Sequence, residues 1–174
     1  MLYVTTSNSS VNQETLFIFS IANPASPLLV GKLDNDPDHN TGLNAVHVAD
    51  SVASDGVKHT YAYAASASSF TDGQLQVIDV TDPANPAVVK TFKIFGVSGS
   101  STQGIGNSIF YQNGYLYIGL TKTVSGPEFN IIEVHNPLEP GLEGGFSIGN
   151  TVNRVFVRNG YAYLATPNDQ ELKT

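Results

Sequence analysis

The segment of residues 34–40 carries the clearest pattern of metal-ligating side chains in the chain. Asp34, Asp36 and Asp38 place three carboxylates at alternating positions, as the first ligands of an EF-hand loop do, and Ca²⁺ prefers such oxygen ligands. The rest of that pattern is absent, because His39 replaces the turn glycine and Ala45 replaces the bidentate glutamate. Two interpretations stay open, a Ca²⁺ site and a solvated acidic loop that binds no cofactor.

The other histidines do not form a metal-binding pattern. His47, His59 and His135 are scattered along the chain without an i, i+4 pair, and there is no cysteine to complete a ligand set. We therefore expect His47 and His135 to pack against neighbours or to cap a strand end.

Familiar catalytic motifs are missing as well. The chain has no Gly-x-Ser-x-Gly sequence, and the serines of residues 98–101 lack a histidine and an aspartate in comparable context. Gly104-Ile105-Gly106 opens a predicted strand and not a helix, so it is no dinucleotide-binding fingerprint. An active site assembled from loops of different repeats would leave no such motif, so the sequence does not exclude an enzyme.

Charge and composition exclude several kinds of partner. The chain has 174 residues with 8 Lys and Arg against 15 Asp and Glu, a net charge of −7. Such an acidic chain is a poor partner for nucleic acid or an anionic membrane. No stretch approaches the roughly 20 apolar residues that cross a bilayer, so we expect no nucleic-acid binding and no membrane insertion.

Composition also bears on location. The absence of cysteine, the scarcity of lysine and the richness in Ser, Thr and Asn favour an extracellular or cell-surface protein. Residues 1–10 contain neither the basic nor the apolar region of a signal peptide, so a cytosolic location is the alternative.

Three segments of the chain repeat one pattern. Each is a run of β-branched and aromatic residues followed by Asn/Asp-Pro-x-x-Pro, which predicts a strand entering a tight turn, since proline cannot join a central ladder. The strands expected before the turns are 16–21, 75–80 and 129–134, and those expected after them are 28–33, 87–92 and 141–146.

A tyrosine-containing strand precedes each of these segments, and a fourth copy follows. The copies lie at 2–4, 61–64, 115–118 and 161–164, and further strands are expected upstream at 44–48, 107–111 and 153–157. Asn113-Gly114 and Asn159-Gly160 predict two-residue hairpin turns between these strands, because both residue types tolerate positive φ.

The repeating unit is therefore four antiparallel strands, without a competing helical periodicity. Units of this kind, recurring about every 40 to 50 residues, are typical of β-propeller blades. We predict an all-β fold: one β-propeller segment over residues 1–174, with blades at about 1–41, 42–103, 104–150 and 151–174, the first and last partial. That is about three and a half blades. Because residues 167–174 head toward a third strand without reaching it, we expect a fragment of a larger ring that the remaining blades of the parent chain complete.

At these residues the chain resembles the LVIVD-repeat family of bacterial and archaeal β-propellers. The second copy matches best, with Leu75-Gln76-Val77-Ile78-Asp79 before the Pro-x-x-Pro turn, whereas Ser20 and Glu133 stand in place of Asp79 in the other copies. The resemblance implies the propeller fold and a secreted or surface protein without an assigned activity.

The propeller fold predicts where the recurring tyrosines and asparagines lie. We expect the tyrosines to pack between blades, with each hydroxyl bonded locally; they are Tyr3, Tyr63, Tyr117 and Tyr163. Asn44, Asn107 and Asn153 recur near the start of the innermost strand, where we expect their amides to face the central channel, and Arg154 beside them is suited to an anion. These four are the predicted ligand-binding residues, with structural hydrogen bonding as the alternative for the asparagines.

The long, variable connections all fall at one end of the blades. They comprise residues 7–14, 34–41, 66–73, 94–103, 122–128 and 166–171. Variable loops on a rigid repeat commonly carry binding, so we predict a non-catalytic module that binds a protein or a glycan there. The alternative is a hydrolase or lactonase-like enzyme with a metal-assisted site at the channel mouth on the same face.

Overall fold

The computed structural model of the protein describes residues 1–7, 13–35, 42–52, 56–67, 73–100, 102–167 and 172–173. Within these ranges the chain forms strands and turns and no helix. This part of the chain accordingly has no helix that could span a membrane. The predicted all-β class is confirmed.

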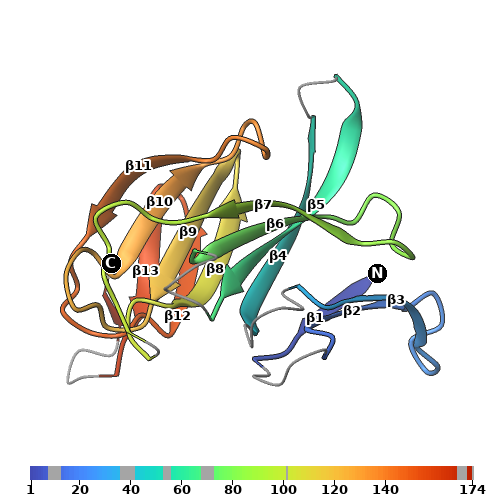
Figure 1. Ribbon diagram of the computed structural model, residues 1–174, viewed down its shortest axis with the longest axis horizontal. Helices are drawn as coiled ribbons and strands as arrows, with labels where there is room; N and C mark the ends of the chain where they lie inside the picture. The colour runs from blue at the N-terminus through green and yellow to red at the C-terminus, as the bar shows by residue number, and fades with distance from the viewer. Residues whose placement is uncertain are drawn as a thin grey trace.

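The strands form four antiparallel sheets that follow one another along the chain (Figure 1). The first sheet contains β1 (Leu2–Thr5), β2 (Leu16–Ser20) and β3 (Leu28–Leu33), and the second contains β4 (Leu43–Val52), β5 (Lys58–Ser66), β6 (Leu75–Asp79) and β7 (Ala87–Phe92). The third contains β8 (Gly106–Gln112), β9 (Tyr115–Leu120), β10 (Phe129–Glu133) and β11 (Gly141–Phe146), and the last contains β12 (Arg154–Arg158), β13 (Tyr161–Ala165) and β14 (Leu172–Lys173). Strands that are consecutive in sequence are neighbours in the sheet, which is the predicted blade.

Each sheet falls inside one of the four predicted blade segments. One detail of the prediction is wrong. The chain does reach the third strand of the last blade, because β14 pairs with β13 through Leu164 with Lys173 and Ala165 with Leu172. The completion of the ring by further blades stays a prediction.

The two kinds of turn form as their residue types require. Asn113 and Asn159 have φ of 52° and 54°, followed by glycines at 81° and 79°, the left-handed pair of a two-residue hairpin. The Asn/Asp-Pro turns close on the side chain of their first residue, since Asp82 Oδ1 accepts from Ala84 N at 3.0 Å and Asn136 Oδ1 accepts from Leu138 N at 3.2 Å. Both turn predictions are confirmed.

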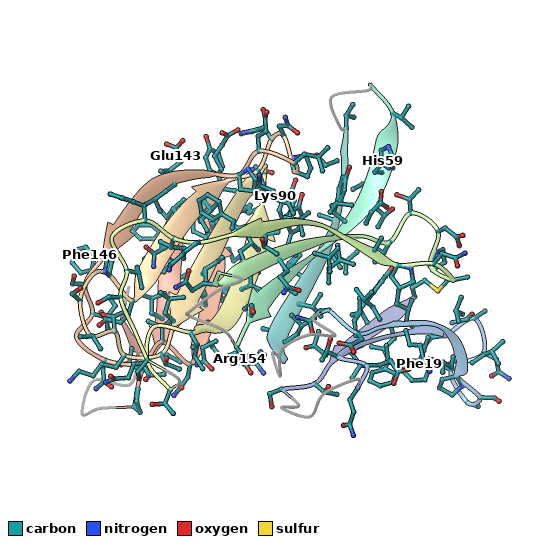
Figure 2. The ribbon with its side chains drawn as sticks, viewed as in Figure 1. Phe19, His59, Lys90, Glu143, Phe146 and Arg154 are labelled. Atoms are coloured by element: carbon teal, nitrogen blue, oxygen red, sulfur yellow. The ribbon has the colours of Figure 1, made fainter. Side chains whose placement is uncertain are left out.

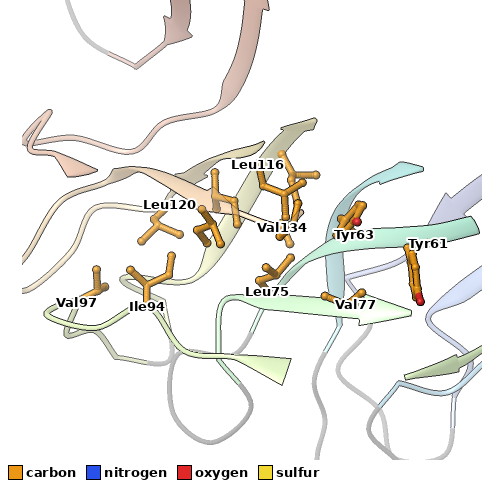
Figure 3. Close-up of a cluster of buried hydrophobic side chains, with 13 residues drawn as sticks. Tyr61, Tyr63, Leu75, Val77, Ile94, Val97, Leu116, Leu120 and Val134 are labelled. Atoms are coloured by element: carbon orange, nitrogen blue, oxygen red, sulfur yellow. The ribbon is translucent and has the colours of Figure 1, made fainter. Parts of the chain in front are cut away.

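The core lies at the seams between successive sheets. The third strands β6 and β10 carry buried apolar side chains on both faces, so each can pack against the sheet before it and the sheet after it. Figure 3 shows Leu75 and Val77 of the second sheet beside Leu116 and Val134 of the third. A matching cluster joins the first and second sheets, and a smaller one joins the third and the last.

Three of the four recurring tyrosines lie in these seams, whereas the ring of Tyr163 contacts Phe156 of its own blade. Tyr63 is fully buried and its ring stacks on Tyr111 of the next blade, with centroids 5.6 Å apart and an interplanar angle of 6°. Tyr3 and Tyr117 pack against the clusters of the first and last seams. The prediction that each hydroxyl forms a local hydrogen bond is wrong for Tyr63, whose buried oxygen has no hydrogen bond to the described residues. Burial there raises the pKa of the Tyr63 hydroxyl.

A β-bulge turns two of the recurring asparagines toward the neighbouring blade. The pairing of β4 with β5 skips Asn44, and that of β8 with β9 skips Asn107. A bulge re-aims its side chain, and Asn44 Nδ2 donates to Gly106 O at 2.7 Å while Asn107 Nδ2 donates to Val152 O at 3.0 Å. Each acceptor immediately precedes the asparagine position of the next blade, so one hydrogen bond recurs at two successive seams.

This recurrence predicts different costs for replacing equivalent asparagines. Asn44→Ala should lower the free energy of unfolding by about 1 kcal/mol, because a half-buried hydrogen bond between sheets is lost. Asn153 has no side-chain hydrogen bond within the described residues, so Asn153→Ala should change stability by less than about 0.5 kcal/mol. Urea unfolding of the two variants measures the difference. Equal losses would mean that the seam hydrogen bond contributes nothing.

Candidate functional site

The predicted ligand-binding residues lie at the starts of the inner strands. Asn44 and Asn107 bond the next blade, whereas Asn153 and Arg154 are exposed at the beginning of the last sheet. Arg154, labelled in Figure 2, has no ion-pair partner in the part of the chain that the structure describes. The structure thus gives two of the four residues a structural use, and their contact with a ligand stays a prediction.

The acidic segment falls mostly outside the described residues. Asp34 is described and half-buried, but Asp36 and Asp38 lie in the undescribed range. Beside them, Asn35 is buried, and its amide donates to Gln76 Oε1 at 3.0 Å. In the described ranges no three His, Asp or Glu side chains come close enough to hold a metal ion. The Ca²⁺ site stays a prediction.

His47 belongs to a row of rings along the inner strands. Its ring meets Phe110 edge to face at 5.3 Å, and Phe110 meets Phe156 in the same way, also at 5.3 Å. The three residues come from β4, β8 and β12 in turn, and β8 lies between the other two. Burial lowers the pKa of His47. The packing role expected for His47 is confirmed.

The other two histidines each meet a carboxylate at the opposite, short-turn end. His59 Nδ1 lies 3.1 Å from Asp79 Oδ2, and His135 Nδ1 lies 2.7 Å from Glu133 Oε1. Burial raises the pKa of Asp79, but hydrogen bonds from Thr81 and His59 outweigh it and hold the pKa below its ordinary value. Because each carboxylate also accepts a backbone N–H two residues ahead, these pairs hold turns inside their own blades.

At the long-loop end, two connections from neighbouring blades are joined. We call residues 94–98, after β7, and 122–126, after β9, the loop pair. Ser98 N donates to Ser125 O at 2.9 Å, Val124 N donates to Ser98 O at 3.0 Å, and the two serine hydroxyls lie 2.7 Å apart. Gly126 has a φ of 92°, and a Cβ there would lie 2.4 Å from Gly96 O. The two loops therefore approach closely enough to require glycine.

Phe95 stands at the corner of a turn within the loop pair. Val97 N donates to Ile94 O at 3.4 Å, and Gly96 has a φ of 80°, as the third position of a type II turn requires. Ile94 and Val97 are buried in the seam cluster, whereas Phe95 is 87% exposed and Val124, on the partner loop, is 63% exposed. The loop pair is thus anchored in the core and presents two apolar side chains to solvent.

A buried carboxylate fixes the neighbouring loops. Glu128 is 3% exposed, and its oxygens accept from Thr123 Oγ1 at 2.8 Å and from Ile148 N and Gly149 N, both at 2.9 Å. Burial raises the pKa of Glu128, but the hydrogen bonds from Gly149, Thr123 and Ile148 outweigh it, so the pKa lies below its ordinary 4.5. One ionised side chain thereby connects the loop before β10 to the loop after β11.

The two loops lie at the end of the blades where the sequence predicts the long connections. The sequence does not, however, single out Phe95, Val124 or Glu128. Phe95 lies in an apolar run with Ile94 and Val97, and the run alone does not tell which side chains are buried. The one usable signal was Gly96, because a glycine third in a tight turn leaves the residue before it at the corner. Glu128 gave no signal, since two of its donors are the backbone N–H groups of Ile148 and Gly149, which lie 20 and 21 residues away in the sequence.

The Glu128 network predicts a pH-dependent stability difference. Because the folded pKa is lowered, ionised Glu128 stabilises the fold above its unfolded pKa, and this contribution is lost as pH falls through the folded pKa. Glu128→Gln should cost roughly 1–3 kcal/mol at about pH 7, and the difference from the wild type should shrink steadily below about pH 4.5. Chemical unfolding at several pH values measures it.

The exposed Glu143 on β11 supplies the matched control. Glu143→Gln should differ little from the wild type at every pH. A Glu128→Gln deficit that stays constant between about pH 7 and about pH 3 would contradict the assignment of an ionised Glu128.

Comparison with known proteins agrees with this architecture. Residues 49–93 match a family model described as LVIVD repeat, and this range holds the end of β4 and all of β5, β6 and β7. No curated protein matches the chain. The matched segment is the copy whose strand β6 ends on Asp79 and whose carboxylate accepts from Thr81 N at 2.8 Å. Residues 49–93 therefore form a segment similar to the LVIVD repeat, and the four sheets follow one another as the blades of a β-propeller segment.

Proposed function

We propose that this β-propeller module is a non-catalytic binding protein that holds a protein partner on the loop pair. The observation that carries the proposal is the exposure of Phe95 and Val124, at 87% and 63%, on two loops that are bonded to each other. Composition supports an extracellular or cell-surface setting for it.

Two properties of the loop pair favour binding. Exposed apolar side chains on neighbouring loops supply the buried contact that anchors protein interfaces, with aromatic residues over-represented among the anchors. The hydrogen bonds between Ser98 and Ser125 and the buried Ile94 and Val97 order the loops before any partner arrives. Such pre-organisation reduces the entropy that association costs.

The charge of the surroundings is compatible with this use. The chain carries a net charge of −7, and Lys122 is the one basic side chain among residues 94–98 and 122–126. Electrostatic steering of a negatively charged partner is therefore weak at the loop pair. A neutral or basic partner surface with an apolar centre fits it best.

The test is selection of binders from a peptide library displayed on phage, using the wild-type protein as bait. Selected peptides should lose at least about tenfold in affinity for a Phe95→Ser/Val124→Ser variant, because both anchors are removed. A Leu28→Ser/Val52→Ser variant is the matched control, since these apolar side chains are 68% and 57% exposed elsewhere in the chain. Thermal melts should show both variants folded.

The outcomes distinguish a protein-binding loop pair from binding elsewhere on the chain and from glycan binding. Loss of affinity confined to the loop-pair variant supports the protein-binding surface. Peptides whose affinity depends on Leu28 and Val52, or no enriched peptide at all, would overturn it. A glycan array on which the wild type binds and the loop-pair variant does not would assign the surface to a glycan instead.

A further inference from the structure

The hairpin turn between β8 and β9 contains a reactive dipeptide, Asn113-Gly114. In an Asn-Gly sequence the glycine nitrogen can attack the side-chain amide carbon of the asparagine, because the glycine has no side chain to obstruct the approach. Asn113 is exposed, and its side chain forms no hydrogen bond within the described residues, so its amide is open to this attack. The turn lies at the short-turn end of the third blade, away from the loop pair.

The folded turn holds the dipeptide in a conformation that does not react. Asn113 and Gly114 have φ of 52° and 81°, the left-handed pair of the two-residue hairpin. Gly114 O accepts from Val134 N at 2.7 Å, which ties the turn to the residue after β10. The attack needs rotation of the Asn113 backbone out of the left-handed region. The turn must therefore open locally before the two atoms can meet.

His135 covers the glycine of this turn. A Cβ on Gly114 would lie 2.5 Å from both Cδ2 and Nε2 of His135, so the imidazole rests against the backbone of the turn. The ring is held from two other sides, because its Nδ1 lies 2.7 Å from Glu133 Oε1 and it meets Tyr115 edge to face at 5.1 Å. Gly114 is buried beneath the ring, although the His135 side chain itself is 57% exposed.

The second blade has neither the histidine nor the reactive dipeptide. By strand register, Thr81 takes the place of His135 there. The hairpin of that blade is longer, with β4 ending at Val52 and β5 beginning at Lys58, and it contains no Asn-Gly sequence. In the third blade, therefore, the covering histidine accompanies the turn that needs cover.

We propose that Asn113 is a site of spontaneous deamidation and that His135 restrains its rate. When the turn opens, Gly114 N forms a bond to Cγ of Asn113, the Cγ–Nδ2 bond breaks, and ammonia leaves with the proton of Gly114 N. Water then opens the resulting succinimide at either carbonyl, which gives aspartate or isoaspartate at position 113. The imidazole slows the first step, because it must leave Gly114 before the turn can open.

The two products differ in what they do to the turn. Aspartate before glycine is compatible with the same two-residue hairpin. Isoaspartate adds a methylene to the main chain, so the turn can no longer keep the register that joins Gly114 O to Val134 N. Deamidation at Asn113 thereby loosens the hairpin of one blade as the protein ages.

Peptide mapping by mass spectrometry of the aged full chain measures conversion at Asn113. His135→Ala should raise the rate at least about threefold, because the open turn becomes more populated when the ring is removed. Asn159-Gly160 is an internal reference in the same molecule, since it is the same dipeptide with φ of 54° and 79°. The rate at Asn159 should be the same in the wild type and in the variant.

His59→Ala is the matched control, because it removes a histidine that pairs with Asp79 at the same end of the second blade. It should leave the rate at Asn113 unchanged. Thermal melts should show both variants folded.

Several outcomes would overturn the proposal. One is an unchanged rate at Asn113 in His135→Ala, and another is a lower rate, which would make the imidazole a promoter of cyclisation. Equal increases at Asn113 and Asn159, or an equal effect of His59→Ala, would show that the variant opens the chain as a whole. Absence of conversion at Asn113 in both the wild type and His135→Ala would show that the site does not react. None of these outcomes bears on the loop pair.

Discussion

The structure depends on the packing of one sheet's third strand against the sheet before it. A four-stranded antiparallel sheet has two faces, and β6 and β10 carry buried apolar side chains on both, so no blade can bury its core alone. Burying a side chain such as Ile132 contributes on the order of 1.5–3 kcal/mol. Contacts between successive sheets therefore supply much of the free energy of unfolding, and each blade depends on its neighbour for stability.

Other features of the molecule follow from these seams. The bulges at Asn44 and Asn107 place one hydrogen bond across successive inner strands, where the ring row of His47 and Phe110 also runs. The loop pair is anchored through Ile94, a member of the same cluster as Ile132. Packing at the seam therefore orders the loop pair. A partner that contacts Phe95 would meet a surface that is already ordered.

Much of the fold could be predicted from the sequence because strands and turns are local. The Asn-Gly hairpins and the paired prolines fix where strands end, and the repetition of these signals gives the four-stranded unit. The resemblance to LVIVD repeats, at residues such as Leu75 and Asp79, agrees with the family match over residues 49–93.

The candidate site was harder to predict because it depends on contacts between blades. For Asn44 the sequence left two roles open, a place facing the channel and a structural hydrogen bond. A bulge, which alternation alone does not reveal, directs its amide to Gly106 O. Glu128 could not be singled out from the sequence, because it accepts hydrogen bonds from the backbone of Ile148 and Gly149, which lie 20 and 21 residues further along the chain. The sequence predicted which end of the blades carries the long loops, but not that Phe95 would be the exposed side chain there.

The most direct measurement of the seam is hydrogen exchange in an Ile132→Ala variant. Ile132 belongs to β10, yet it packs in the cluster that holds Leu75 and Val77 of β6. Removing most of a buried isoleucine costs about 2–5 kcal/mol. If the seam holds the blades together, amides of β6 should lose protection to the same extent as those of β10. Faster exchange confined to β8, β9, β10 and β11 would show that the third blade is stable without its neighbour and would contradict this account.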